Sequence, residues 1–194
     1  RQMCIRDSDY FIQYAGVDER GEQTGPMKGG VVIFAAGNEN KDYRTYPAAY
    51  EKVVSVAAYA PDYKKSWYSN FADWVDIAAP GGTYGYGRKY NGECAVYSTL
   101  PDNQYGYMQG TSMACPHVSG VAALGLAYAA KTNRHYRAAD FVALMKKSVK
   151  DLDSHYQNGA TKTYYMNHTT VGASPEIVPV SYTHLRAHET SQDL

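Results

Sequence analysis

Residues 110–120 read Gly-Thr-Ser-Met-Ala-Cys-Pro-His-Val-Ser-Gly and open a long run of small and apolar residues, and this stretch decides the fold. From Val118 to Ala130 the run would be apolar on nearly every side of a helix, so we expect a helix in the interior of a sizeable domain. Ser112 lies at its start, where unpaired backbone N–H groups and the helix dipole would stabilise an oxyanion. A short Gly-Thr-Ser alone would favour a plain N-cap serine, but eleven residues of this composition are more specific.

A second informative segment runs from Gly29 to Asn38 and reads Gly-Gly-Val-Val-Ile-Phe-Ala-Ala-Gly-Asn. The unbroken apolar run Val31–Phe34 predicts a strand buried on both faces, as in a parallel α/β sheet. Gly37 allows a sharp turn, and Asn38 then follows the carboxyl end of the strand, where open α/β sheets bind ligands. A lone Asn at such a place is more often a turn residue, so this segment by itself leaves both interpretations open.

Together these two segments resemble the subtilisin-like serine proteases (subtilases), and the chain between them does so as well. The further matching stretches are Thr45–Tyr50, Val53–Ala58, Ser66–Phe71, Val75–Gly81 and Ser98–Pro101. The resemblance runs from about Asp9 to about Tyr156. It implies an α/β protein with a partial subtilisin-like fold, in which a mostly parallel sheet is flanked by helices.

The resemblance also implies a function, that of a secreted serine endopeptidase that hydrolyses polypeptides through an acyl-enzyme on Ser112. In that family the side chain at the position of Asn38 donates to the tetrahedral oxyanion. The segment Ala35, Ala36 and Gly37 would form one wall of the pocket for the side chain before the scissile bond. Thr45 would stand at the pocket floor, where many subtilases have glycine, and its stiff β-branched side chain would favour small or medium substrate residues.

Acyl transfer by a serine needs a general base and a group that orients it. All histidines lie after Ser112, at positions 117, 135, 155, 168, 184 and 188. Subtilases carry Asp, then His, then Ser, so we expect both partners upstream of this chain. His117 lies five residues further along the same helix, so its side chain points away from Ser112, and we expect a packed, hydrogen-bonded helix histidine.

An α/β-hydrolase order, serine then acid then histidine, would nominally use Asp151 or Asp153 with His155 or His168. That class needs Gly-x-Ser-x-Gly at a strand-to-helix turn, and here Ala114 replaces the second glycine, so we reject it. We therefore expect the chain to lack two-thirds of its triad and to be inactive by itself. The competing hypothesis is a catalytically inactive subtilase-like domain kept for binding or scaffolding, against which the intact Ser112 and Asn38 count.

The two ends match neither flanking element of the family. We expect residues 1–8 and 180–194 to be translated sequencing-adapter read-through and residues 9–179 to be the partial catalytic domain. Within it, Asp9–Ala15 is expected to end a helix, residues 16–30 to form a polar surface loop, and Arg137–Lys150 to form a second helix.

Composition is typical of one globular unit: 194 residues, 44% hydrophobic and 20% charged. Lys plus Arg equals Asp plus Glu at 19 each, so no nucleic-acid partner is indicated, and no apolar run approaches the ~20 residues of a membrane helix. Twenty tyrosines suit an extracellular or cell-surface location. Outside the suspect terminus, Cys94 and Cys115 permit at most one bridge. No metal-ligand spacing occurs, and although family resemblance allows calcium, its ligands cannot be assigned.

Overall fold

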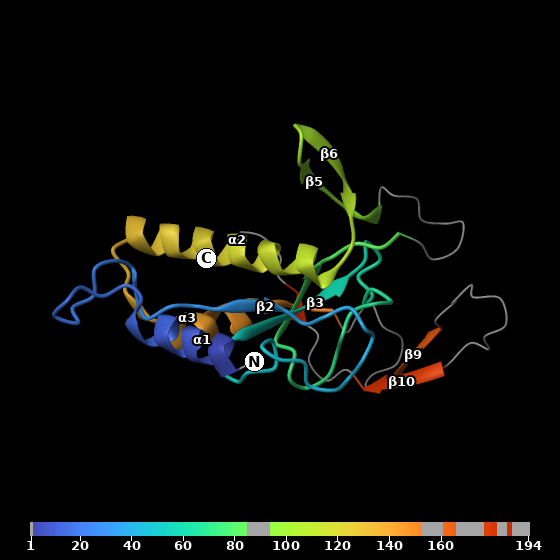
Figure 1. The fold of residues 1–194 in the computed structure, drawn as a ribbon, viewed down its shortest axis with the longest axis horizontal. Helices are drawn as coiled ribbons and strands as arrows, with labels where there is room; N and C mark the ends of the chain where they lie inside the picture. The colour runs from blue at the N-terminus through green and yellow to red at the C-terminus, as the bar shows by residue number, and fades with distance from the viewer. Residues whose placement is uncertain (1, 85–93, 153–160, 166–176, 182–185, 188–194) are drawn as a thin grey trace.

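The computed structural model describes residues 2–84, 94–152, 161–165, 177–181 and 186–187 (Figure 1). A five-stranded sheet forms the centre, with the strand order β2-β3-β4-β11-β8. Its strands are β2 Ile33–Ala35, β3 Val54–Tyr59, β4 Ile77–Pro80, β11 Arg186–Ala187 and β8 Lys150–Asp151. The first four are mutually parallel and β8 is antiparallel to β11. The predicted α/β class with a mostly parallel sheet is confirmed.

Alternation along β3 divides its side chains between two apolar layers. Val54, Val56 and Ala58 face the helix layer, where they pack with residues of α2 Thr111–Lys131 and α3 Ala138–Lys147. Ala57 and Tyr59 face an opposite layer made of loop residues. Every residue of β3 is buried, so this strand is the centre of the core.

Helix α2 differs from the sequence prediction, which placed it inside the domain. One face packs on β2, β3 and β4, but the opposite face exposes Leu124 (68%) and Tyr128 (42%). Its composition is apolar all round, but among the described residues only the sheet side is covered. By length and composition alone α2 would also fit a membrane span, a test that core helices of globular domains pass too.

Strand β2 also departs from its prediction. It begins at Ile33 rather than Val31 and its residues are half-buried rather than fully buried. Within the described part of the chain it pairs only with β3, so it forms an open edge of the sheet.

The segment before α2 forms a hairpin of two antiparallel strands, β5 Val96–Leu100 and β6 Gln104–Met108. At its tip Asp102 and Asn103 adopt φ values of 60° and 57°, a left-handed conformation that Asp and Asn tolerate. Figure 1 shows the hairpin standing away from the sheet near the start of α2. Among the described elements, its extensive contacts are confined to its own two strands.

The remaining elements are α1 Gln2–Tyr14, the parallel pair β1 Met27–Lys28 and β7 Tyr136–Arg137, and the antiparallel pair β9 Thr161–Tyr165 and β10 Ile177–Ser181. Helix α1 thus includes most of residues 1–8, and β11 lies within residues 180–194. Helix α3 is shorter than the predicted range, because its C-cap is Ser148 and β8 follows at Lys150. Cys94 and Cys115 are both free.

The loop between α1 and β1 is an exposed polar turn, but the range predicted for it, residues 16–30, extends too far, because Met27–Lys28 form β1 and Gly29 and Gly30 are buried. The Asp18 carboxylate accepts hydrogen bonds from the backbone N–H groups of Arg20 and Glu22 at 2.9 Å each. These local bonds give the loop tip a defined shape without burying it.

Candidate active site

Ser112 is the second residue of α2, and its side chain is exposed at the carboxyl edge of the parallel strands. Gly110, the N-cap, has φ 151° and ψ 159°, and its N–H donates to the carbonyl of Gly81, the residue after β4, at 3.0 Å. That bond fixes the start of the helix against the end of a central strand. Such an edge is where α/β sheets bind their ligands.

The first N–H groups of α2 are occupied with one exception. The Thr111 N–H donates to Asn38 Oδ1, and the N–H groups of Met113 and Ala114 both donate to the Gly110 carbonyl. No acceptor for the Ser112 N–H occurs among the described residues. The backbone donor beside the Ser112 hydroxyl is therefore available to an external oxyanion.

Asn38 and the start of α2 are joined directly, although 73 positions separate Asn38 from Thr111. Asn38 Oδ1 accepts hydrogen bonds from both the N–H and the Oγ1 of Thr111, at 2.9 Å each. Thr111 Oγ1 in turn accepts from the Gly37 N–H at 3.2 Å. Because Oδ1 takes both bonds, the Asn38 Nδ2 group is directed toward Gly110, where it lies 3.7 Å from the position a Cβ would take.

The turn that carries Asn38 is held by a fully buried side chain, Asn70. Its Oδ1 accepts from the N–H groups of Glu39 and Lys41 at 3.1 and 3.0 Å, and its Nδ2 donates to the Ala36 carbonyl at 3.0 Å. A Cβ on Gly37 would lie 2.4 Å from Asn70 Nδ2, and Gly37 has φ 106°, so only glycine fits.

Lys65 braces the same turn from inside the protein, with 1% of its surface exposed. Its Nζ donates to Asn40 Oδ1 at 2.7 Å and to the carbonyls of Ser66 and Ser69 at 3.0 and 2.8 Å. Burial disfavours the ammonium form and lowers the pKa of Lys65 to about 7. Sequence reasoning assigned no role to Thr111, Asn70 or Lys65, since only the contacts across the fold reveal them.

The four residues predicted to bind substrate also meet at this edge. Ala35 ends β2, and buried Ala36 follows it, with its N–H donating to the Val56 carbonyl at 2.9 Å. Thr45 Oγ1 donates to the Ala36 carbonyl at 2.8 Å. The Thr45 side chain therefore lies against the segment that contains Ala36 and Gly37.

Neither histidine within the described ranges is placed to act as the general base for the Ser112 hydroxyl. The ring of His117 is hydrogen-bonded through Nδ1 to the Met113 carbonyl at 2.7 Å, as expected, but it is exposed rather than packed. His135 contacts Gln23 and the Gly25 carbonyl in the loop before β1. Asp153, His155 and His168, weighed above as alternatives, lie outside the described residues. No cluster of His, Cys, Asp or Glu that could hold a metal ion occurs in the described part of the chain.

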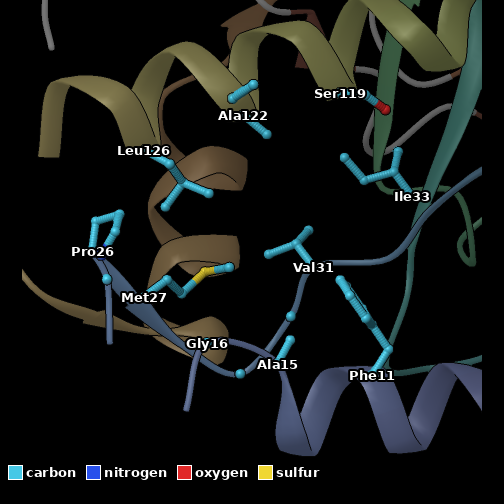
Figure 2. Close-up of a pocket in the computed structure, with 14 residues that line it drawn as sticks. Phe11, Ala15, Gly16, Pro26, Met27, Val31, Ile33, Ser119, Ala122 and Leu126 are labelled. Carbon is cyan, nitrogen blue, oxygen red and sulfur yellow. The ribbon is translucent and has the colours of Figure 1, made fainter. Parts of the chain in front are cut away.

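A separate cavity of about 430 Å³ lies further along α2, between that helix, α1 and the segment around β1. Figure 2 shows apolar side chains pointing into it, among them Phe11, Met27, Val31 and Leu126. Ser119 is the one hydroxyl-bearing side chain among the described lining residues, and its Oγ donates to the Cys115 carbonyl within its own helix at 3.2 Å.

Known proteins of one family resemble this chain over most of its length. The model of the subtilase family matches residues 11–167. A thermophilic serine proteinase of Bacillus sp. (strain AK1) is 41% identical over 112 residues, which cover 58% of this chain and 25% of that protein. An extracellular basic protease of Dichelobacter nodosus is 41% identical over 104 residues, covering 50% of this chain and 15% of that protein.

Solved structures give the same result. A protease from Pseudoalteromonas arctica PAMC 21717 superposes with a TM-score of 0.56 and 27% identity, covering 74% of this chain and 51% of that one. The chain therefore spans about half, or less, of the length of these similar proteins.

Proposed function

The chain belongs to the subtilase family of serine proteases, and on that premise we propose that the whole protein is a secreted endopeptidase whose nucleophile is Ser112. The observation that carries the proposal is the join between Asn38 and the start of α2. Thr111 fixes the Asn38 amide by two hydrogen bonds to Oδ1. Asn38 Nδ2 and the Ser112 nitrogen then lie 3.7 and 3.6 Å from one point, the position that a Cβ on Gly110 would take.

In the proposed reaction Ser112 Oγ attacks the carbonyl carbon of the scissile peptide bond. The carbonyl oxygen becomes an oxyanion that accepts from Asn38 Nδ2 and the Ser112 N–H. A histidine outside the described residues takes the hydroxyl proton and returns it to the leaving amine, and an aspartate orients that histidine. Water then releases the acyl group from Ser112 and restores its hydroxyl.

The substrate is a polypeptide. We propose that the side chain before the scissile bond enters a pocket with Ala35, Ala36 and Gly37 on one wall and Thr45 at its floor. The bond from Thr45 Oγ1 to Ala36 supports this arrangement, because it ties the floor to the wall. Secretion is supported by the name of the extracellular relative and by the tyrosine-rich composition.

The test is kinetic and uses the whole protein expressed from the complete gene. Ser112→Ala is expected to abolish proteolysis, and Asn38→Ala to lower kcat by about 10²–10³-fold with little change in KM, because it removes a donor used mainly in the transition state. Thr111→Val is the matched variant: it keeps the Thr111 N–H but loses Oγ1, so a smaller loss of about tenfold is expected.

Full turnover by Asn38→Ala would overturn the oxyanion assignment. A whole wild-type protein that hydrolyses no peptide, and whose upstream sequence lacks a catalytic Asp and His, would instead be the inactive binding or scaffolding domain.

A further inference from the structure

We propose that one face of the β5–β6 hairpin binds an extended stretch of the polypeptide substrate, several residues away from the scissile bond. The face consists of Tyr97, Tyr105, Tyr107 and Thr99, and we call it the tyrosine face. This inference rests on the proposed function, since it assigns a second contact for the same substrate.

The register of the hairpin gathers these side chains. Tyr97 is opposite Tyr107, and Thr99 is opposite Tyr105, so all four point to one side of the two strands. The ring of Tyr97 lies 4.8 Å from that of Tyr107 and 5.8 Å from that of Tyr105, measured between centroids. The rings thus form one continuous aromatic surface.

This surface is open to solvent. Tyr97 is 58% exposed, Tyr105 63% and Tyr107 41%. A two-stranded hairpin is at best marginally stable by itself, and ring contacts across its strands contribute to its stability. Those contacts leave the outer faces of the rings uncovered, and tyrosine offers a large, rigid and amphipathic contact area to a partner at low cost in conformational entropy.

The charge of the hairpin selects the class of partner. From Val96 to Met108 the only charged residue is Asp102, at the tip. A nucleic-acid surface requires Lys or Arg for the phosphates, and the hairpin has none. Uncharged aromatic rings suit the backbone and apolar side chains of a polypeptide.

The tyrosine face is fixed relative to Ser112. The Tyr84 N–H donates to Gln109 Oε1 at 2.6 Å, and the Tyr84 hydroxyl donates to the Tyr107 carbonyl, so the base of the hairpin is held by the segment after β4. That segment also holds the start of α2, through the bond from the Gly110 N–H to the Gly81 carbonyl.

The number of residues between the tyrosine face and Ser112 limits how far apart the two can lie. Tyr107 precedes Ser112 by five residues and Tyr105 by seven, which span at most ~17 and ~24 Å when extended. An extended substrate advances by a similar length per residue. The tyrosine face therefore lies within about five to seven substrate residues of the scissile bond.

The experiment compares two fluorogenic peptides with the same cleavable core in the whole protease. One peptide has two residues on each side of the bond, and the other has eight, including Leu and Phe in the outer positions. The variants are Tyr105→Thr and Tyr97→Thr, since threonine keeps a strand-forming side chain. Tyr105→Phe retains the ring, and Tyr10→Thr removes an exposed, ring-paired tyrosine on α1 as a matched control.

We expect each Tyr→Thr hairpin variant to raise KM for the long peptide by about three- to tenfold. The kcat for the long peptide and both kinetic constants for the short peptide are expected to stay unchanged. Tyr105→Phe and Tyr10→Thr are expected to behave like wild type. Binding of the long peptide to Ser112→Ala, followed by fluorescence polarisation, is expected to weaken by the same factor.

Unchanged KM for the long peptide in both Tyr→Thr variants overturns the inference. An equal loss with both peptides also overturns it, since the rings would then act by positioning Ser112. If the two Tyr→Thr variants keep the wild-type kinetic constants for both peptides but lose binding to an insoluble polysaccharide, the tyrosine face binds a different ligand and the inference is overturned. If wild type cleaves neither peptide, the proposed function falls, and this inference with it.

Discussion

At the scale of single residues, the site depends on how one oxygen atom is used. Asn38 Oδ1 accepts two hydrogen bonds from Thr111, and this leaves the Nδ2 end of the amide directed toward Gly110, at the start of α2. Ser112 and Asn38 could be proposed from the sequence because each lies in a distinctive stretch, and the structure brings the two segments together. The roles of Thr111 and Asn70 could not, because they arise from contacts between segments far apart in the chain.

Thr45 gives a prediction on specificity. If its side chain narrows the pocket floor, the whole protease prefers small or medium apolar residues before the scissile bond over Phe or Tyr. Differences of a few methylenes are then worth about 1–3 kcal/mol each in kcat/KM. Thr45→Gly is expected to shift the preference toward large residues on a peptide library. Thr45→Ser is the control, since it retains the hydroxyl that bonds Ala36. The same preference for large residues in wild type and Thr45→Gly would contradict the assignment.

Lys65 gives a prediction on stability. Its pKa of about 7 in the folded protein lies below its ordinary value of 10.5, so between these values the unfolded chain binds more protons. The free energy of unfolding therefore rises with pH across this range, and this contribution is lost as the pH falls to 7. Urea unfolding of the whole protein in the Ser112→Ala background, at pH 6, 8 and 10, measures it. In Lys65→Met the rise due to this group is expected to disappear, and identical pH profiles for the two proteins would refute the shift.

At the scale of elements, the sequence predicted well which segments form strands and helices. It predicted less well which other segments cover them. The apolar run Val53–Ala58 became β3, buried throughout, because it has a neighbouring strand on each side. Only Ile33 and Phe34 of the similar run Val31–Phe34 lie in the open edge strand β2, and among the described residues α2 is covered on one face only. The hydrophobic composition of a segment predicts how strongly it favours burial. How much of it is actually buried depends on which other segments pack against it.

Leu124 tests this explanation, because it is 68% exposed on the outer face of α2. In the whole protein we expect that face to be covered, so that Leu124→Ala lowers the free energy of unfolding by about 2–4 kcal/mol. In the 194-residue chain the same change is expected to have an effect within about 0.5 kcal/mol. Val118→Ala, at a fully buried position, is the control that destabilises both. A small effect of Leu124→Ala in both proteins would show that this face stays exposed.

At the scale of the whole molecule, the chain brings together the proposed nucleophile and the proposed oxyanion donors, while both histidines in the described ranges bond to other groups. We expect the 194-residue chain to hydrolyse no peptide efficiently, because an unassisted serine hydroxyl is a weak nucleophile. The oxyanion donors alone are expected to give a residual rate about 10³-fold above uncatalysed hydrolysis in water. The exposed face of α2 also favours aggregation, so the monomeric fraction should be assayed.

Serine-directed fluorophosphonate labelling measures this directly, with Ser112→Ala as the control. Slow, substoichiometric labelling is the expected result. Fast and stoichiometric labelling at Ser112 would show that the chain supplies its own base.

The exposed polar turn between α1 and β1 has a consequence for the lifetime of an active protease. Residues 18–22 are exposed and are held by local bonds to Asp18 and by one bond from Lys28 Nζ to the Gly21 carbonyl, which makes them a preferred place for one molecule to cut another. Asn38, Ser112 and the whole central sheet lie after this turn in the chain. A nick there would separate Asn38 and Ser112 from the catalytic Asp and His that we expect upstream, so we expect self-digestion at this turn to end activity once the two pieces dissociate.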